Sequence, residues 1–116
     1  MSETILVAED HDALRRVIRR SLEGAGYTVI APENSSEALA LIRDRDVGFD
    51  LLLTDLIMPD VSGEELVREL EASRPQVPAI YMSGYGAISD GGQTPMLGKP
   101  FLPEQLVAAV HSALRD

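Results

Sequence analysis

Apolar residues along the chain fall into short runs separated by longer stretches with helical spacing. The runs span residues 4–8, 27–31, 51–54, 79–82 and 95–98, and each has the length of a β-strand. Between the runs, apolar residues recur every three or four positions, which is typical of amphipathic helices. A regular alternation of strands and helices predicts an α/β fold with right-handed crossovers and one parallel sheet covered on both faces.

Helix-start signals divide the chain at the same places. Asn34 with Glu37 and Ser62 with Glu65 have the spacing of capping boxes, and Pro103 suits the first turn of the last helix. The first predicted helix, 12–25, places four large apolar residues on one face: Leu14, Val17, Ile18 and Leu22. We therefore predict five strands with intervening helices in one domain.

Composition narrows the possible functions. A chain of 116 residues with 45% apolar residues fits a single domain, 1–116, with its own core. The absence of cysteine excludes thiol catalysis and zinc–thiolate sites, and the net charge of −9 disfavours nucleic-acid binding. No apolar run approaches the roughly 18 residues of a membrane span, and residues 1–3 carry no signal-peptide pattern. We expect a cytoplasmic domain that contacts neither nucleic acid nor membrane.

Polar residues at the strand ends are the candidates for chemistry. Glu9 and Asp10 follow the first strand, Asp55 the third, Ser83 the fourth and Lys99 the fifth. In a parallel sheet these residues meet at one edge. Clustered carboxylates repel one another and favour a divalent cation, with Mg²⁺ the natural choice because it leaves positions for phosphate oxygens.

A carboxylate beside Mg²⁺ and a lysine can act as a nucleophile toward phosphoryl groups. Asp55 is the best candidate, with Lys99 and Ser83 placed to contact the phosphoryl oxygens. Each residue alone has a simpler interpretation as a turn or surface residue, and only their combination favours a phosphoryl-transfer site. His11 could touch the metal shell, although an exposed histidine at a helix entry is the simpler interpretation.

The segment LTDLIMPDVSG (residues 53–63) resembles the phosphorylation-site segment of response-regulator receiver domains of two-component signalling systems, the CheY-like family. Three further motifs occur in the family's order: Glu9-Asp10, Ser83-Gly84-Tyr85 and Lys99-Pro100-Phe101. The resemblance covers the whole chain, and its motif style is closest to receivers of hybrid sensor histidine kinases. It implies a flavodoxin-like (βα)5 fold with strand order 2-1-3-4-5.

The resemblance also implies roles for the acidic residues. Asp55 would accept the phosphoryl group from a histidine kinase or histidine phosphotransfer protein. Asp10 and Asp55 would bind Mg²⁺ directly, Glu9 mostly through water, and Ile57 through its backbone carbonyl. The domain would then be no enzyme beyond self-catalysed phosphoryl transfer to and from Asp55.

Two further residues acquire roles by resemblance. Lys99 would pair with the phosphoryl group, and the Lys99-Pro100 peptide bond would be cis. The Ser83 hydroxyl would move to bind the phosphoryl group after transfer and so switch a partner-binding surface. The identity of the downstream protein partner stays open.

The chain departs from the family pattern between Ser83 and Lys99. The interval is short and contains four glycines, so Ala87 to Asp90 could form one turn at most. We predict that the fourth helix is missing or vestigial. Met96 stands where the family often has an aromatic residue, so dimerisation through the fourth-helix face is doubtful.

Three other functional classes share features with this sequence. A phosphatase of the haloacid-dehalogenase type needs an acid where Ile57 stands, and a flavodoxin-like FMN carrier needs a phosphate loop where Glu9 and Asp10 stand. The serious alternative is a receiver-like interaction or adaptor module that works without phosphorylation. The altered fourth-helix region and Met96 favour that alternative, whereas the complete set of strand-end residues opposes it.

Overall fold

The computed structural model describes residues 2–84 and 94–115. Its strands are β1 (Thr4–Ala8), β2 (Thr28–Ile30), β3 (Leu51–Asp55), β4 (Ala79–Ser83) and β5 (Met96–Gly98). Its helices are α1 (Asp12–Gly24), α2 (Ser35–Arg43), α3 (Gly63–Ser73) and α4 (Pro103–Arg115). The alternation predicted from the apolar pattern is confirmed. The ends of the strands differ from the predicted ends by no more than one residue.

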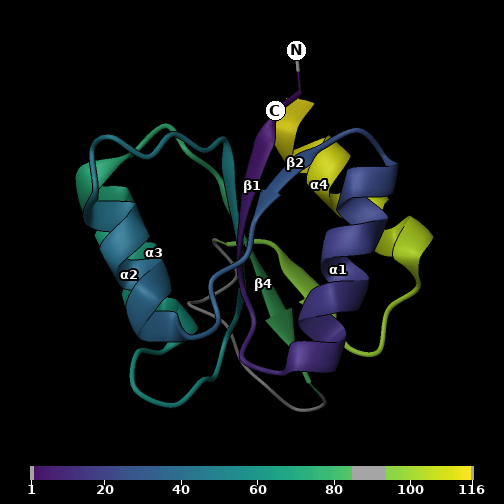
Figure 1. Ribbon diagram of the computed structural model, residues 1–116, viewed down its shortest axis with the longest axis horizontal. Coiled ribbons are helices and arrows are strands. Elements are labelled where there is room, and N and C mark those ends of the chain that lie inside the picture. Colours follow the sequence, from purple (N-terminus) through teal and green to yellow (C-terminus); the bar gives the residue numbers. More distant parts are fainter. Residues whose placement is uncertain (1, 85–93, 116) are drawn as a thin grey trace.

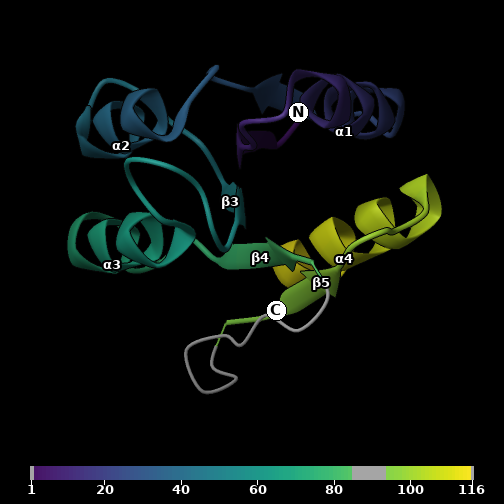
Figure 2. The same ribbon diagram turned by 90° about the horizontal axis from the view of Figure 1, so that it is seen from below.

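All strand pairs are parallel, in the order β2-β1-β3-β4-β5. This is the expected flavodoxin-like order 2-1-3-4-5, with β3 at the centre and β5 at one edge (Figure 2). The register aligns Ala8 with Thr54 and Asp55 with Met82. The carboxyl ends of the three middle strands therefore end at nearly the same level.

Two helical layers cover the sheet. Helices α2 and α3 lie on one face and α1 and α4 on the other (Figure 1). Each layer encloses its own apolar cluster, built around Leu6, Leu52 and Leu66 under α2 and α3, and around Val7, Ile18 and Leu53 under α1 and α4. Every residue of β3 is buried, because its side chains alternate between these two clusters.

The predicted helix starts are largely confirmed. Ser62 and Glu65 form a reciprocal capping box at α3, and Asn34 caps α2 by accepting a hydrogen bond from the Glu37 backbone N–H. The expectation that Val17 packs inward is wrong. Its side chain is 50% exposed, because the face of α1 that meets the sheet is narrower than the apolar spacing suggests.

The four helices are consistent with a missing or vestigial fourth crossover helix. The proposed turn at Ala87 to Asp90 lies outside the described residues. Within those residues, no helix is long and apolar enough to cross a bilayer. Both ends of the chain lie at the same end of the sheet, where the strand β1 begins (Figure 1).

Candidate functional site

Two neighbouring strands bring the carboxylates together. Glu9 and Asp10 directly follow β1, and Asp55 ends β3, which pairs with β1 up to the level of Ala8 and Thr54. Glu9 is 1% and Asp55 4% exposed, whereas Asp10 is half-buried. Ligand atoms of Glu9, Asp10, His11 and Asp55 lie within 4.8 Å of one another. The parallel register thus produces the acidic cluster expected from the sequence.

Lys99 reaches the same cluster from the edge of the sheet. Its backbone N–H donates to the Ser83 carbonyl over 2.7 Å, which extends the pairing of β5 with β4. Its Nζ lies 2.5 Å from Asp55 Oδ1 and 3.0 Å from Glu9 Oε1. One ammonium therefore stands between two buried carboxylates. The expected cis peptide bond between Lys99 and Pro100 is also present.

These contacts shift the pKa values of the cluster in opposite directions. Burial, followed by a hydrogen bond shared with Glu9, raises the pKa of Asp55 to about 8, although Lys99 opposes the rise. Burial also raises the pKa of Glu9, but hydrogen bonds from Asp55, the His11 N–H and Lys99 outweigh it and leave that pKa lowered. Without a metal ion, the shared environment therefore favours protonation of Asp55 over protonation of Glu9.

The lysine responds to the same environment. Burial lowers the pKa of Lys99, but the hydrogen bonds to Asp55 and Glu9 outweigh burial and raise the pKa above its usual value. Lys99 is therefore a fixed positive charge. Such a charge can pair with carboxylates or with the oxygens of a phosphoryl group.

Backbone contacts hold Asp55 in place. The Leu56 N–H donates to the Met82 carbonyl, and the Gly63 N–H donates to the Leu56 carbonyl, each over 2.9 Å. Helix α3 approaches so closely that a Cβ on Gly63 would collide with the Asp55 carbonyl oxygen and lie 2.9 Å from Leu56 Cα. Glycine at position 63 therefore permits α3 to begin directly against the candidate nucleophile.

Ser35 anchors the loop that follows Asp55. Its buried hydroxyl donates to the Pro59 carbonyl over 2.8 Å and accepts from the Val61 N–H over 3.1 Å. Between them, Asp60 adopts a positive φ of 67°. This loop carries Ile57, whose backbone carbonyl is a candidate metal ligand and whose side chain is 78% exposed. Sequence reasoning missed Ser35, because only the fold places α2 beside this loop.

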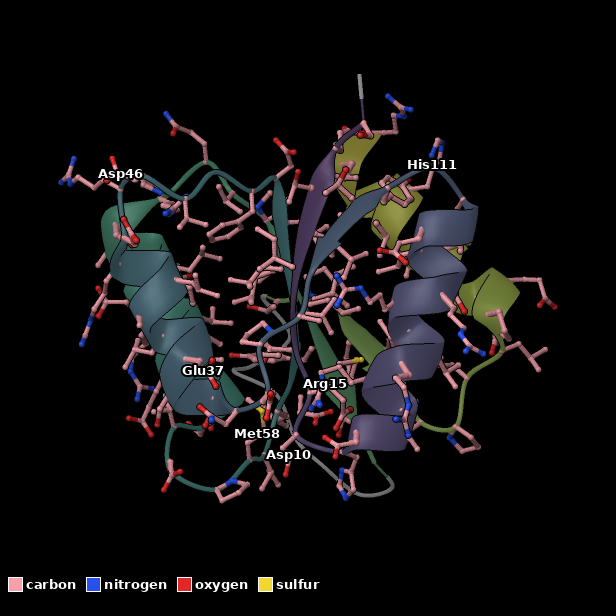
Figure 3. The ribbon with its side chains drawn as sticks, viewed as in Figure 1. Asp10, Arg15, Glu37, Asp46, Met58 and His111 are labelled. Carbon is pink, nitrogen blue, oxygen red and sulfur yellow. The ribbon has the colours of Figure 1, made fainter. Side chains whose placement is uncertain are left out.

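Arg15 anchors the loop that follows β1. Its guanidinium donates to the carbonyls of Glu9 over 3.0 Å and Glu33 over 3.3 Å, and it pairs with Asp12 over 2.5 Å. Figure 3 shows Arg15 at the same end of the molecule as Asp10. Its side chain is 13% exposed, so these contacts hold the arginine largely buried. The three-residue spacing of Asp12 and Arg15 indicates their ion pair in the sequence. The contacts of Arg15 with the Glu9 and Glu33 carbonyls depend on tertiary structure and have no sequence signal.

Ser83 completes the cluster at the end of β4. It is 5% exposed, and its hydroxyl donates to the Gly84 carbonyl over 3.0 Å. A cavity of about 90 Å³ lies against eight residues: His11, Asp55, Leu56, Ile57, Met82, Ser83, Gly84 and Lys99. The candidate nucleophile Asp55, the Ser83 hydroxyl and the Lys99 ammonium therefore face one small cavity.

The cluster suits a divalent cation. Carboxylate and carbonyl oxygens are the ligands that Mg²⁺ takes in proteins, and Glu9, Asp10 and Asp55 supply them here. Asp55 Oδ1 is buried and lies 2.5 Å from the Lys99 ammonium, so the three clustered carboxylates share a single ammonium. A buried oxygen of this kind is stabilised by a cation.

Larger hollows elsewhere lack this chemistry. A groove of about 580 Å³ between α1 and α4 is lined mainly by small and apolar residues such as Ala25, Val107 and Ala108. The small cavity beside Asp55 is therefore the candidate site, despite its size.

Comparison with known proteins agrees with this assignment. Residues 5–111 match the family model described as "Response regulator receiver domain". The chain is 34% identical over 97% of its length to part of the sensor kinase CckA of Brucella abortus, and 36% identical over 99% to part of the response regulator MprA of Mycobacterium ulcerans. It spans 13% and 51% of those two proteins.

Solved structures show the same likeness. A response regulator receiver protein from Sinorhizobium medicae superposes with a TM-score of 0.90 at 27% identity, over 98% of this chain and 95% of that one. The receiver domain of the hybrid histidine kinase CckA superposes with a TM-score of 0.82 at 32% identity, over 96% of this chain and 98% of that one.

Proposed function

The chain belongs to the response regulator receiver domain family, and from that premise we propose that it accepts a phosphoryl group on Asp55 in the presence of Mg²⁺. The donor is the phosphohistidine of a histidine kinase or histidine phosphotransfer protein. The observation that carries the proposal is the placement of buried Asp55 against Lys99 and beside two further carboxylates, on the small cavity that Ser83 also lines.

The transfer step follows from these contacts. An Asp55 carboxylate oxygen attacks phosphorus, an O–P bond forms, the N–P bond of the donor breaks, and the donor imidazole leaves with the electron pair. Lys99 and the Ser83 hydroxyl bind the phosphoryl oxygens. Glu9, Asp10, Asp55 and the Ile57 carbonyl hold Mg²⁺, which supplies charge neutralisation on those oxygens.

Asp55 must lose its proton to act as a nucleophile. The raised pKa of Asp55 favours the protonated form in the metal-free protein. A bound divalent cation favours the carboxylate and so couples metal binding to proton release. Lys99 stays protonated throughout and holds the carboxylate in position.

Phosphorylation then acts as a switch. The new group carries about two negative charges in place of the one on Asp55. Its oxygens compete with the Gly84 carbonyl for the Ser83 hydroxyl, which now donates over 3.0 Å to that carbonyl. Rotation of Ser83 toward the phosphoryl group changes the end of β4 and the surface beside it, where a downstream protein partner binds.

The domain is proposed to act in the cytoplasm and on no separate substrate, so that its chemistry is limited to gain and loss of the phosphoryl group on Asp55. The alternative, an interaction module independent of phosphorylation, leaves the Glu9–Lys99–Asp55 arrangement without a purpose. An intact pocket supports the first function over the second.

The test uses acetyl phosphate with Mg²⁺ and intact-mass measurement. We expect wild-type protein to gain one phosphoryl group and Asp55→Asn to gain none. Asp46→Asn is the matched control, because Asp46 is exposed and lies at the opposite end of the molecule from Asp10 (Figure 3). A gain that persists in Asp55→Asn, or no gain in folded, metal-bound wild type, contradicts the proposal.

A further inference from the structure

His11 lies against the same cavity as Asp55, Ser83 and Lys99. It precedes α1 as the N-cap residue, yet its side chain makes no capping hydrogen bond to the helix. Histidine is not among the residues favoured at this position. Helix stability therefore gives no reason for an imidazole here.

The imidazole points into the acidic cluster. Its Nδ1 lies 3.2 Å from Glu9 Oε2 and 3.7 Å from Asp10 Oδ1. The side chain is 78% exposed, so it can adjust to a ligand at little packing cost. One ring nitrogen and three carboxylates thus share a volume in which all the ligand atoms lie within 4.8 Å of one another.

A second observation points to a cation in this volume. Glu9 and Asp55 are 1% and 4% exposed, and a single ammonium, that of Lys99, is paired with both of them while Asp10 lies beside them. A cation placed between Asp55 and Asp10 would offset the remaining negative charge and would also be within reach of His11. The cluster therefore offers a mixed nitrogen and oxygen ligand set, whereas Mg²⁺ needs oxygen alone.

We propose that His11 is a nitrogen ligand to the divalent ion and gives the pocket a preference for first-row transition ions, such as Co²⁺, over Mg²⁺. Imidazole binds these ions well, and their affinity for nitrogen ligands rises along the series from Mn²⁺ to Cu²⁺. The inference rests on the proposed function, because it assumes that the acidic cluster holds a cation.

A purely structural role for His11 has a different consequence. The ring could instead orient Glu9, to which both its Nδ1 and its backbone N–H are close. Loss of that orientation would weaken every divalent ion alike. Loss of a nitrogen ligand weakens transition ions selectively, so the ratio of two affinities separates the roles.

The experiment measures Co²⁺ and Mg²⁺ affinities by calorimetry at pH 7.5, with the visible spectrum of Co²⁺ as a direct report of its ligands. In His11→Ala we expect Co²⁺ affinity to fall by about tenfold or more and Mg²⁺ affinity to change less than about twofold. His11→Ala should also alter the Co²⁺ spectrum. His111→Ala is the matched control, because the sequence has two histidines and His111 lies at the opposite end of the molecule (Figure 3).

Other outcomes overturn the inference. Equal weakening of both ions would make His11 a structural residue, and unchanged Co²⁺ affinity would exclude it as a ligand. Either result in His11→Ala leaves the proposed function intact, provided that the wild type binds Mg²⁺ and is phosphorylated. Failure of the wild type to bind either ion would instead contradict the metal site of the proposed function.

Discussion

The two halves of the pocket are held very differently. The acidic half, defined as Glu9, Asp10 and Asp55, follows β1 and β3, and every residue of β3 is buried. The lysine half, defined as Ser83 and Lys99, follows β4 and β5, and β5 is a three-residue edge strand whose Met96 and Gly98 are exposed. The comparison teaches that the sheet interior fixes the three carboxylates, while the edge of the sheet delivers the ammonium of Lys99.

The largest predicted effect tests the tight packing of the acidic half. Gly63→Ala should lower the free energy of unfolding by about 3 kcal/mol, because its Cβ collides with the Asp55 carbonyl and the backbone must shift. The matched change in the lysine half is Gly98→Ala, where a Cβ meets nothing within 4 Å. It should change stability by less than about 1 kcal/mol.

Urea unfolding of both variants measures this contrast. Equal stability losses would show that the two halves are packed alike and would break the comparison. A small loss in Gly63→Ala would mean that α3 can move away from Asp55 without disturbing the core.

A smaller effect concerns pH. The pKa of Asp55 rises from 3.8 to about 8 on folding, so between those values the folded state binds a proton that the unfolded state lacks. The stability of metal-free protein should therefore fall as pH rises from 5.5 to 7.5, by up to about 1.4 kcal/mol per pH unit. Asp55→Asn should remove the slope and be the more stable protein at pH 7.5.

Unfolding measured at pH 5.5, 6.5 and 7.5 checks the slope. This range lies above the ordinary pKa of Glu9, whose lowered value affects stability only at more acid pH. Asp46→Asn should keep the wild-type slope. A slope that survives in Asp55→Asn would assign the proton to another group and remove the buried acid from the comparison.

The smallest effect concerns Ile57, an exposed residue that lines the cavity beside the acidic half. Ile57 is 78% exposed beside the cavity, where its bulky side chain would shield a phosphoryl group on Asp55 from water. Ile57→Asn should shorten the lifetime of the phosphoryl group by up to about tenfold, or about 1 kcal/mol of barrier. Decay of phosphorylated protein followed by intact mass gives the lifetime, and an unchanged or longer lifetime in the variant would contradict the prediction.

The sequence predicted the placement of the chemical groups well, for a physical reason. Short apolar runs mark strands, and parallel strands bring Glu9, Asp55 and Lys99 to one edge whatever the details of packing. Their roles in phosphoryl transfer remain proposals.

The supporting contacts could not be predicted in the same way. Arg15 and Ser35 donate hydrogen bonds to backbone carbonyls of residues that the fold brings near, and Gly63 lies against another such carbonyl. Neither the hydrophobic periodicity nor the composition of the sequence predicts these contacts. Val17 shows the converse case, since it has the spacing of a core residue but lies half-exposed on α1. Local patterns thus determine elements and strand ends, whereas the contacts that fix a site depend on three-dimensional proximity.

Both chain ends lie at the pole of the sheet opposite Asp10 (Figures 1 and 3). A tether, a fluorescent fusion or a surface attachment joined at either end would therefore leave the approach to the pocket open. A large binding partner would then reach the pocket of an immobilised protein as readily as that of a free one. The same geometry leaves the pocket accessible when the domain is fused to another protein at either end.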